Sequence, residues 1–115
     1  MRSPEPRVTP RGGGTVPAES DIRRAMAQEG LDPYRWSNGP GDVYGAHHHG
    51  FHKVIYVVRG SITFGLPDTG DRLLLSAGDR LDLPAGVRHD AVVGPQGVVC
   101  LEGHQTVQGP EKEKR

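Results

Sequence analysis

Residues 41–60 read GDVYGAHHHGFHKVIYVVRG and contain four of the six histidines of the chain, directly before a strongly apolar run. Side chains two residues apart on a β-strand point to the same face of the sheet. His47 and His49 can therefore enter one cavity from a single strand, and His48 between them is expected to face the other way. Residues 54–58 are β-branched or aromatic throughout, which predicts a strand buried on both faces. A turn at residues 59–61 would then lead into a second strand and form a hairpin.

A second stretch, residues 78–89 (GDRLDLPAGVRH), places another histidine after a Pro-Ala-Gly turn. Pro84 cannot donate a hydrogen bond to a neighbouring strand, so it is expected at a strand end. His89 would begin the next strand and point inward. With His47 and His49 it predicts a three-imidazole metal site, since imidazole nitrogens bind zinc, copper, iron and nickel.

The two stretches together resemble the motifs of the cupin superfamily, in particular those of small single-domain bacterial cupins. The first motif is matched by Gly41, His47, His49 and Gly60. The second is matched by Gly78, Pro84, Gly86 and His89. The chain departs from the pattern at Lys53, where the family has a metal-binding glutamate, and at Val93, where it has an asparagine. The matching region, residues 41–93, is nearly half of the chain.

The resemblance implies an all-β fold, a cupin-type antiparallel β-barrel or jelly roll, here with one short N-terminal helix. The apolar runs and turns fit this fold and predict about eight strands. They are expected at residues 34–37, just before the histidines, and at 54–58, 61–64, 72–75, 80–83, 90–93 and 98–102.

The domain organisation follows from composition along the chain. Residues 1–17 are rich in proline and glycine and are expected to be disordered. Residues 18–30 are expected to form a short helix that packs Ile22 and Met26 on the barrel exterior or on a partner subunit. The barrel would span residues 31–104 and a polar tail residues 105–115.

Length and charge narrow the function classes. The chain has 115 residues, enough for one domain, and its 14 basic and 14 acidic residues give a formal net charge of zero. This balance predicts neither a nucleic-acid nor a membrane-surface partner. No apolar run approaches the ~20 residues that span a bilayer, and the Met1 end lacks a secretion signal, so we expect a cytoplasmic protein.

The candidate site residues fall into three groups. The metal ligands are His47, His49 and His89, with His52 as a further candidate if the chain turns before it. The ligand-binding candidates are Lys53, Trp36 and Tyr44, although Trp36 also fits a core or dimer-interface role. Lys53 and Tyr44 are candidate catalytic groups.

Lys53 leaves three alternatives open, because an ammonium close to a divalent ion must be compensated. It could turn to the rim and pair with Asp82 or Asp90. It could lose its proton through a lowered pKa. It could also hold an anion between itself and the metal, in which case the cavity would receive an anionic molecule.

The cupin resemblance implies a divalent metal cofactor (zinc, iron, manganese or nickel), a small-molecule ligand or substrate, and a homodimer. Three functions fit the residues. The first is a metal-dependent enzyme, either a dioxygenase or an isomerase or lyase. The others are a non-catalytic ligand-binding or sensing module and a metal-free module. Cupin sites serve many chemistries, so the site has to decide among them.

Overall fold

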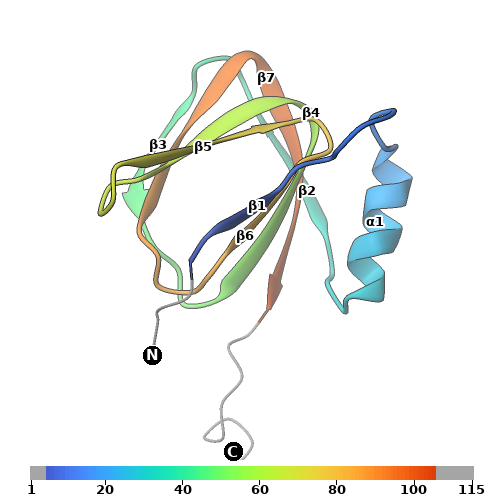
Figure 1. Cartoon of the computed structure of the whole chain (residues 1–115), viewed down its shortest axis with the longest axis horizontal. Coiled ribbons are helices and arrows are strands. Elements are labelled where there is room, and N and C mark those ends of the chain that lie inside the picture. Colours follow the sequence, from blue (N-terminus) through green and yellow to red (C-terminus); the bar gives the residue numbers. More distant parts are fainter. Residues whose placement is uncertain (1–4, 106–115) are drawn as a thin grey trace, which may run out of the picture.

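Two long strands, β4 (His52–Leu66) and β7 (His89–Gln105), run antiparallel through the molecule and carry the fold (Figure 1). The computed structural model describes residues 5–105. Both strands bend at the same place, where the register between them shifts near Gly60. Gly60 has φ 79°, and a Cβ on it would lie 2.0 Å from the Gly97 carbonyl oxygen. The close approach of β4 to β7 therefore requires glycine at this position.

Because β4 and β7 bend, each contributes to two halves of the sheet. In one half the order is β1 (Arg7–Thr9), β6 (Arg80–Leu83), β4, β7 and β2 (Tyr34–Asn38). In the other half β5 (Asp71–Ser76) pairs with β4, and β3 (Val43–His47) pairs with β7. The strand path is open, and the antiparallel jelly roll of the cupin fold predicted from the sequence is confirmed.

The strand count differs from the prediction in two ways. The expected hairpin at residues 59–61 is wrong, because its two strands are continuous halves of β4 that pair with β7 and not with each other. Residues 90–93 and 98–102 likewise belong to one strand, β7. A glycine with positive φ can bend a strand as well as reverse it, and the local sequence does not distinguish these outcomes.

The N-terminal segment is also more ordered than expected. Within residues 1–17, expected to be disordered, β1 pairs with β6, and Val8 packs against the core. The free edge of β6 offers backbone partners that composition does not reveal. Residues 1–4 and 106–115, most of the predicted tail, lie outside the described residues, and Gln105 at its start is the last residue of β7.

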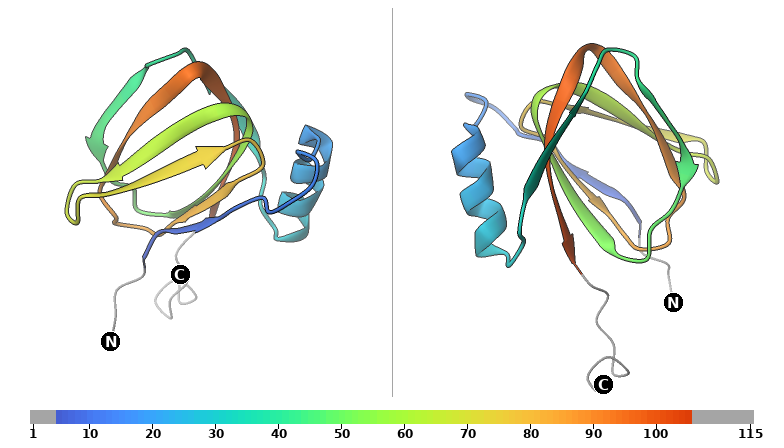
Figure 2. Two further views of the ribbon diagram at one scale, coloured as in Figure 1. Left: turned by 45° about the horizontal axis from the view of Figure 1, so that its top comes forward. Right: turned by 180° about the vertical axis from the view of Figure 1, so that it is seen from behind.

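Helix α1 (Glu19–Gln28) lies outside the barrel, as both views in Figure 2 show. Its buried residues Ile22 and Met26 pack with Leu31, Val54 and Leu101. Ile55 and Val57 face the main core inside the barrel, while Val54 faces the helix. The strand predicted to be buried on both faces is therefore covered on both, and the helix packs on the exterior as expected. Among residues 5–105, no helix is long and apolar enough to cross a membrane.

Candidate metal centre and ligand cavity

Three histidines meet where β3 ends and β7 begins. The Cα of His47 pairs with that of His89 across the two strands. His49 lies just beyond β3, and its carbonyl oxygen accepts a hydrogen bond of 2.8 Å from the Gly86 N–H. This bond holds the Pro-Ala-Gly turn before His89 against the chain at His49. The two histidine-bearing stretches of the sequence are joined here through the backbone.

The three imidazoles have a geometry that fits a metal ion. One ring nitrogen from each of His47, His49 and His89 lies within 4.8 Å of the others. The Nδ1 atoms of His47 and His89 lie 2.7 Å from the Gly45 oxygen and 2.9 Å from the Val87 oxygen. An Nδ1–H that donates to a carbonyl leaves the Nε2 lone pair for a metal. The Nε2 of His49 is buried without a hydrogen-bond partner among the described residues.

The protonation state of these rings also suits metal binding. Burial, together with the charges of Lys53, His47 and His89, lowers the pKa of His49 to about 4. Burial also lowers the pKa of His89, against an opposing hydrogen bond to the Val87 carbonyl. Neutral imidazole is the form that binds a metal, so both rings are prepared for a ligand role at neutral pH.

The other histidines lie elsewhere. His48 is exposed, as its position between His47 and His49 predicted. His52, the further metal candidate, is not brought to the cluster, and its Nε2 lies 3.0 Å from Asp82 Oδ1. His104 is exposed and stacks on Phe51 with a centroid distance of 4.2 Å.

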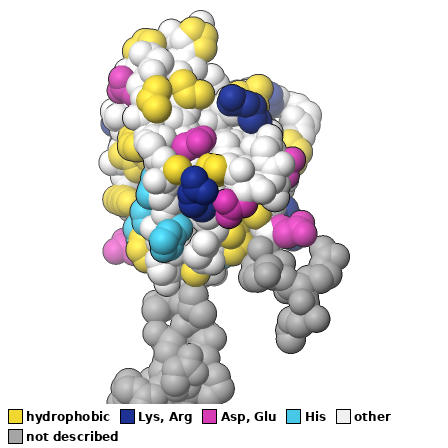
Figure 3. Space-filling view, turned by 90° about the vertical axis from the view of Figure 1, so that its left-hand side faces the viewer, with side chains coloured by type: hydrophobic (Ala, Val, Ile, Leu, Met, Phe, Trp, Pro, Cys, Tyr) yellow, Lys and Arg dark blue, Asp and Glu magenta, His cyan; other side chains and the backbone are white. Residues whose placement is uncertain are grey.

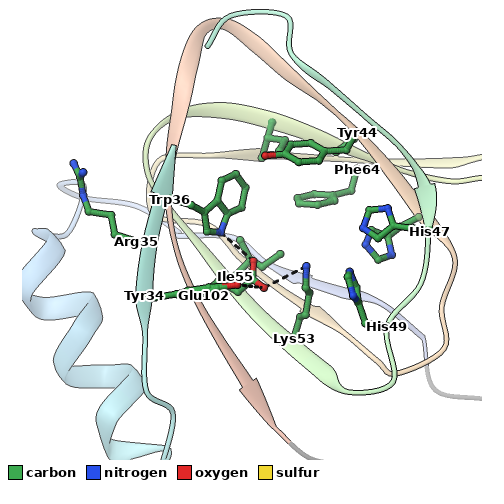
Figure 4. Close-up of a pocket in the computed structure, with 13 residues that line it drawn as sticks. Tyr34, Arg35, Trp36, Tyr44, His47, His49, Lys53, Ile55, Phe64 and Glu102 are labelled. Carbon is green, nitrogen blue, oxygen red and sulfur yellow. Dashed lines mark hydrogen bonds and ion pairs between the residues drawn. The ribbon is translucent and has the colours of Figure 1, made fainter. Parts of the chain in front are cut away.

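Lys53 points into the cavity, and its Nζ lies 3.2 Å from Glu102 Oε2 (Figure 4). The alternative in which Lys53 turns to the rim and pairs with Asp82 or Asp90 is not observed. Asp82 is bound to Arg80 and His52, and the Asp90 carboxylate lies over Gly65. Lys53 pairs in register with His104 on β7, so the glutamate two residues away on the same face is within its reach.

Glu102 is the residue that the sequence analysis missed. It is 3% exposed and accepts hydrogen bonds from Trp36 Nε1 at 3.0 Å and the Tyr34 hydroxyl at 2.9 Å, while His104 Nε2 lies 2.5 Å from it. Burial raises the pKa of Glu102, but the His104 contact, the Lys53 charge and the Tyr34 hydrogen bond outweigh burial and hold it below its usual value. A lone acidic residue directly after the apolar run VVCL was the available signal.

The cavity beside the histidines has a volume of about 370 Å³. Trp36 and Tyr44, both ligand-binding candidates, line it, with their rings edge to face at 6.2 Å. The Tyr44 hydroxyl donates to Asn38 Oδ1. Figure 4 shows Tyr44 and Phe64 across the cavity from Lys53 and Glu102. The remaining lining residues are Tyr34, Arg35, Ile55, Ile62, Phe64 and Ala91.

The fold and the histidine cluster together define a cupin, the class that the sequence motifs predicted. Residues 31–107 match the family model described as the AraC-like ligand binding domain, and the chain belongs to this family. No curated protein matches the chain.

Solved structures agree with this assignment. An RmlC-like cupin from Shewanella frigidimarina is 27% identical, with a TM-score of 0.57 and 68% of each chain covered. The polyketide cyclase RemF from Streptomyces resistomycificus is 26% identical, with a TM-score of 0.57, over 64% of this chain and 54% of RemF. KdgF from a Halomonas species is 25% identical, with a TM-score of 0.55, over 71% of this chain and 73% of KdgF.

Proposed function

We propose that the chain binds a divalent metal through His47, His49 and His89 and uses the adjoining cavity to bind a small molecule. The observation that carries this proposal is the buried, unpartnered Nε2 of His49 in a cluster where one ring nitrogen from each of the three histidines lies within 4.8 Å of the others. A buried nitrogen without a partner is costly unless something binds it. Zinc, iron, manganese or nickel is the cofactor we propose, and three protein ligands would leave positions open for a ligand.

Ligand binding without turnover is the function that the cavity supports best. Both catalytic candidates are engaged, because Lys53 is paired with Glu102 and the Tyr44 hydroxyl donates to Asn38. The family model is that of a ligand-binding domain. The interspersed acidic and basic side chains on the face shown in Figure 3 fit a partner other than nucleic acid. The homodimer and the cytoplasmic location stay predictions.

An enzyme is the second candidate, and one observation favours it. The polyketide cyclase RemF is 26% identical to this chain over 64% of its length. A bound divalent ion acts as a Lewis acid toward a carbonyl oxygen. The cavity would then bind its molecule for an isomerase- or lyase-type reaction, with Lys53 orienting it.

The metal site is tested by the double substitution His47→Ala with His49→Ala. We expect stoichiometric divalent metal in the parent protein and none in the variant, because two of the three nitrogen ligands are lost. The variant should keep its far-ultraviolet circular dichroism, since the aliphatic strands carry the fold. Elemental analysis of protein purified without a histidine tag provides the measurement.

The matched control is His48→Ala, which removes an exposed histidine from the same segment. This variant should retain the metal content of the parent. Equal metal content in the double variant and the parent, or metal lost on changing His48 alone, would contradict the proposed site.

A further inference from the structure

The carboxylate of Glu102 is largely occupied by donors of the protein itself. Its Oε1 accepts from Trp36, and its Oε2 is approached by Tyr34, Lys53 and His104. A carboxylate offers about four acceptor sites, two on each oxygen, so Oε2 is saturated and at most one site, on Oε1, stays open. A molecule that must donate several hydrogen bonds therefore finds little free carboxylate acceptor capacity among the described residues of the cavity wall.

Lys53, in contrast, has donors to spare. Its ammonium carries three N–H groups, and among the described residues Glu102 is the acidic residue within ion-pair distance. The Lys53 side chain is 14% exposed and lines the cavity beside the histidines. Two of its N–H groups remain available to an acceptor in the cavity.

The net charge of the cavity also favours a molecule that accepts hydrogen bonds, in particular an anion. Lys53 and Glu102 offset each other, and a divalent ion at the histidines would add two positive charges. Such an excess of positive charge in a partly closed, low-dielectric site attracts anions.

Apart from Tyr34 and Arg35, the rest of the cavity wall is apolar. Trp36, Tyr44 and Phe64 present aromatic rings, and Ile55, Ile62 and Ala91 complete the wall. At about 370 Å³ the cavity is at the small end of ligand sites, which suits a molecule with one ring or a short branched chain.

We propose that the ligand of this chain is a small carboxylate anion with a flat apolar body, and that Lys53 selects it by binding its head group beside the three histidines. Glu102 limits how strongly Lys53 attracts the anion, because it offsets the charge of Lys53 and takes one N–H group of the ammonium. Neutral polyols are poor ligands, because they need several acceptors and Glu102 offers at most one free site. The inference rests on the proposed metal and ligand site and names its ligand class.

The test uses three probes on the full chain, with and without one equivalent of zinc, by isothermal titration calorimetry. Benzoate is the anionic probe, benzamide its neutral counterpart of the same shape, and ribose the neutral polyol. We expect benzoate to bind the zinc-loaded protein at least about tenfold more tightly than either neutral probe, since charge-assisted hydrogen bonds are the stronger ones.

Two substitutions separate the roles of the charged pair. Lys53→Met should weaken benzoate binding by about tenfold and leave benzamide unchanged. Glu102→Gln should strengthen benzoate binding by a similar factor, because the charge of Lys53 is no longer offset. Since Lys53→Met leaves a buried carboxylate without its cation and could unfold the domain, the double variant Lys53→Met with Glu102→Gln is measured too. It should bind benzoate as weakly as the single Lys53 variant.

The outcomes distinguish the inference from the proposed function. Stoichiometric zinc with no preference for benzoate, or benzoate affinity unchanged in a folded Lys53 variant, would overturn the inference and leave the metal site standing. Tighter binding of ribose than of benzoate would overturn it as well. Failure of the parent protein to bind zinc would overturn the proposed function itself, and the inference that rests on it.

Discussion

Lys53 stands where the cupin pattern has a metal-binding glutamate, and the structure shows an ion-pair partner for it that the sequence did not suggest. The side chain stays inside the cavity and is compensated by a carboxylate from β7, Glu102, whose side chain is 4% exposed. Burying two charges costs desolvation energy, and removing one partner of such a pair is strongly destabilising. Positions 53 and 102 are therefore energetically coupled.

The substitution Lys53→Glu tests this coupling. We expect it to place two carboxylates together in the metal-free protein and to lower its thermal unfolding midpoint, because like charges a few ångströms apart repel. The same substitution should raise the affinity for divalent metal above that of the parent. Lys53→Met should fall between them in metal affinity. Calorimetric metal titration and thermal unfolding, with and without zinc, measure both effects.

The contrary outcome is also well defined. Equal metal affinity for the parent and the Lys53→Glu and Lys53→Met variants would mean that the charge at position 53 does not act on the three histidines.

Between elements, a polar cluster outside the cavity ties α1 to the barrel. Arg80 on β6 donates to Glu29, just after α1, at 2.6 Å and to Asp82 at 2.8 Å. Its guanidinium also donates to the Tyr56 hydroxyl at 3.2 Å. His52 reaches the same Asp82 from β4. This cluster accounts for His52, which the sequence placed among the metal candidates.

Asp82 gives this cluster a pH dependence. Burial raises the pKa of Asp82, but the bonds from Arg80 and His52 outweigh burial and hold it below the ordinary value of 3.8. A lowered pKa in the folded state stabilises the protein above pH 3.8, and this stability is lost as the pH falls through the folded-state pKa. We expect Asp82→Asn to lower the free energy of unfolding at pH 7 by about 1–3 kcal/mol. The difference from the parent should shrink below pH 3.8.

Urea unfolding at a series of pH values provides the measurement. The control is Asp68→Asn. Asp68 forms an ion pair of 3.0 Å with Arg88, and the side chains of Arg88 and Asp68 are 49% and 72% exposed. Exposed pairs contribute little, so this variant should unfold like the parent. A constant difference between Asp82→Asn and the parent across the whole range would contradict the role given to Asp82.

At the scale of the whole molecule, the shared bend of β4 and β7 sets the shape of the cavity. The bend allows the same two strands to carry Lys53 and Glu102 in one half and His89 in the other. Without it, the two ends of the site would lie on one flat sheet.

Gly60→Ala tests the bend. We expect this variant to lose at least about 2 kcal/mol of unfolding free energy, from the positive φ and from the contact of the new Cβ with the Gly97 oxygen. Gly70→Ala is the matched control, because Gly70 has φ 83° and no atom within 4 Å of the added Cβ. It should lose only about 1–2 kcal/mol, the backbone contribution. Equal losses in the two variants would show that the close approach at Gly60 contributes nothing.

The sequence by itself determined most of the strand segments between residues 34 and 102, which face of α1 is buried, and which histidines converge. These features depend on local rules: side chains alternate along a strand, apolar residues recur along a helix, and the spacing of His47, His49 and His89 matches the cupin motifs. Only the tertiary structure decided that Glu102 forms an ion pair with Lys53, that His52 binds Asp82 in the polar cluster outside the cavity, and that β4 bends without reversing. Each of these depends on the register between segments far apart in the chain, such as Ile55 with Glu102. That register is set by packing across the whole barrel, which no local stretch encodes.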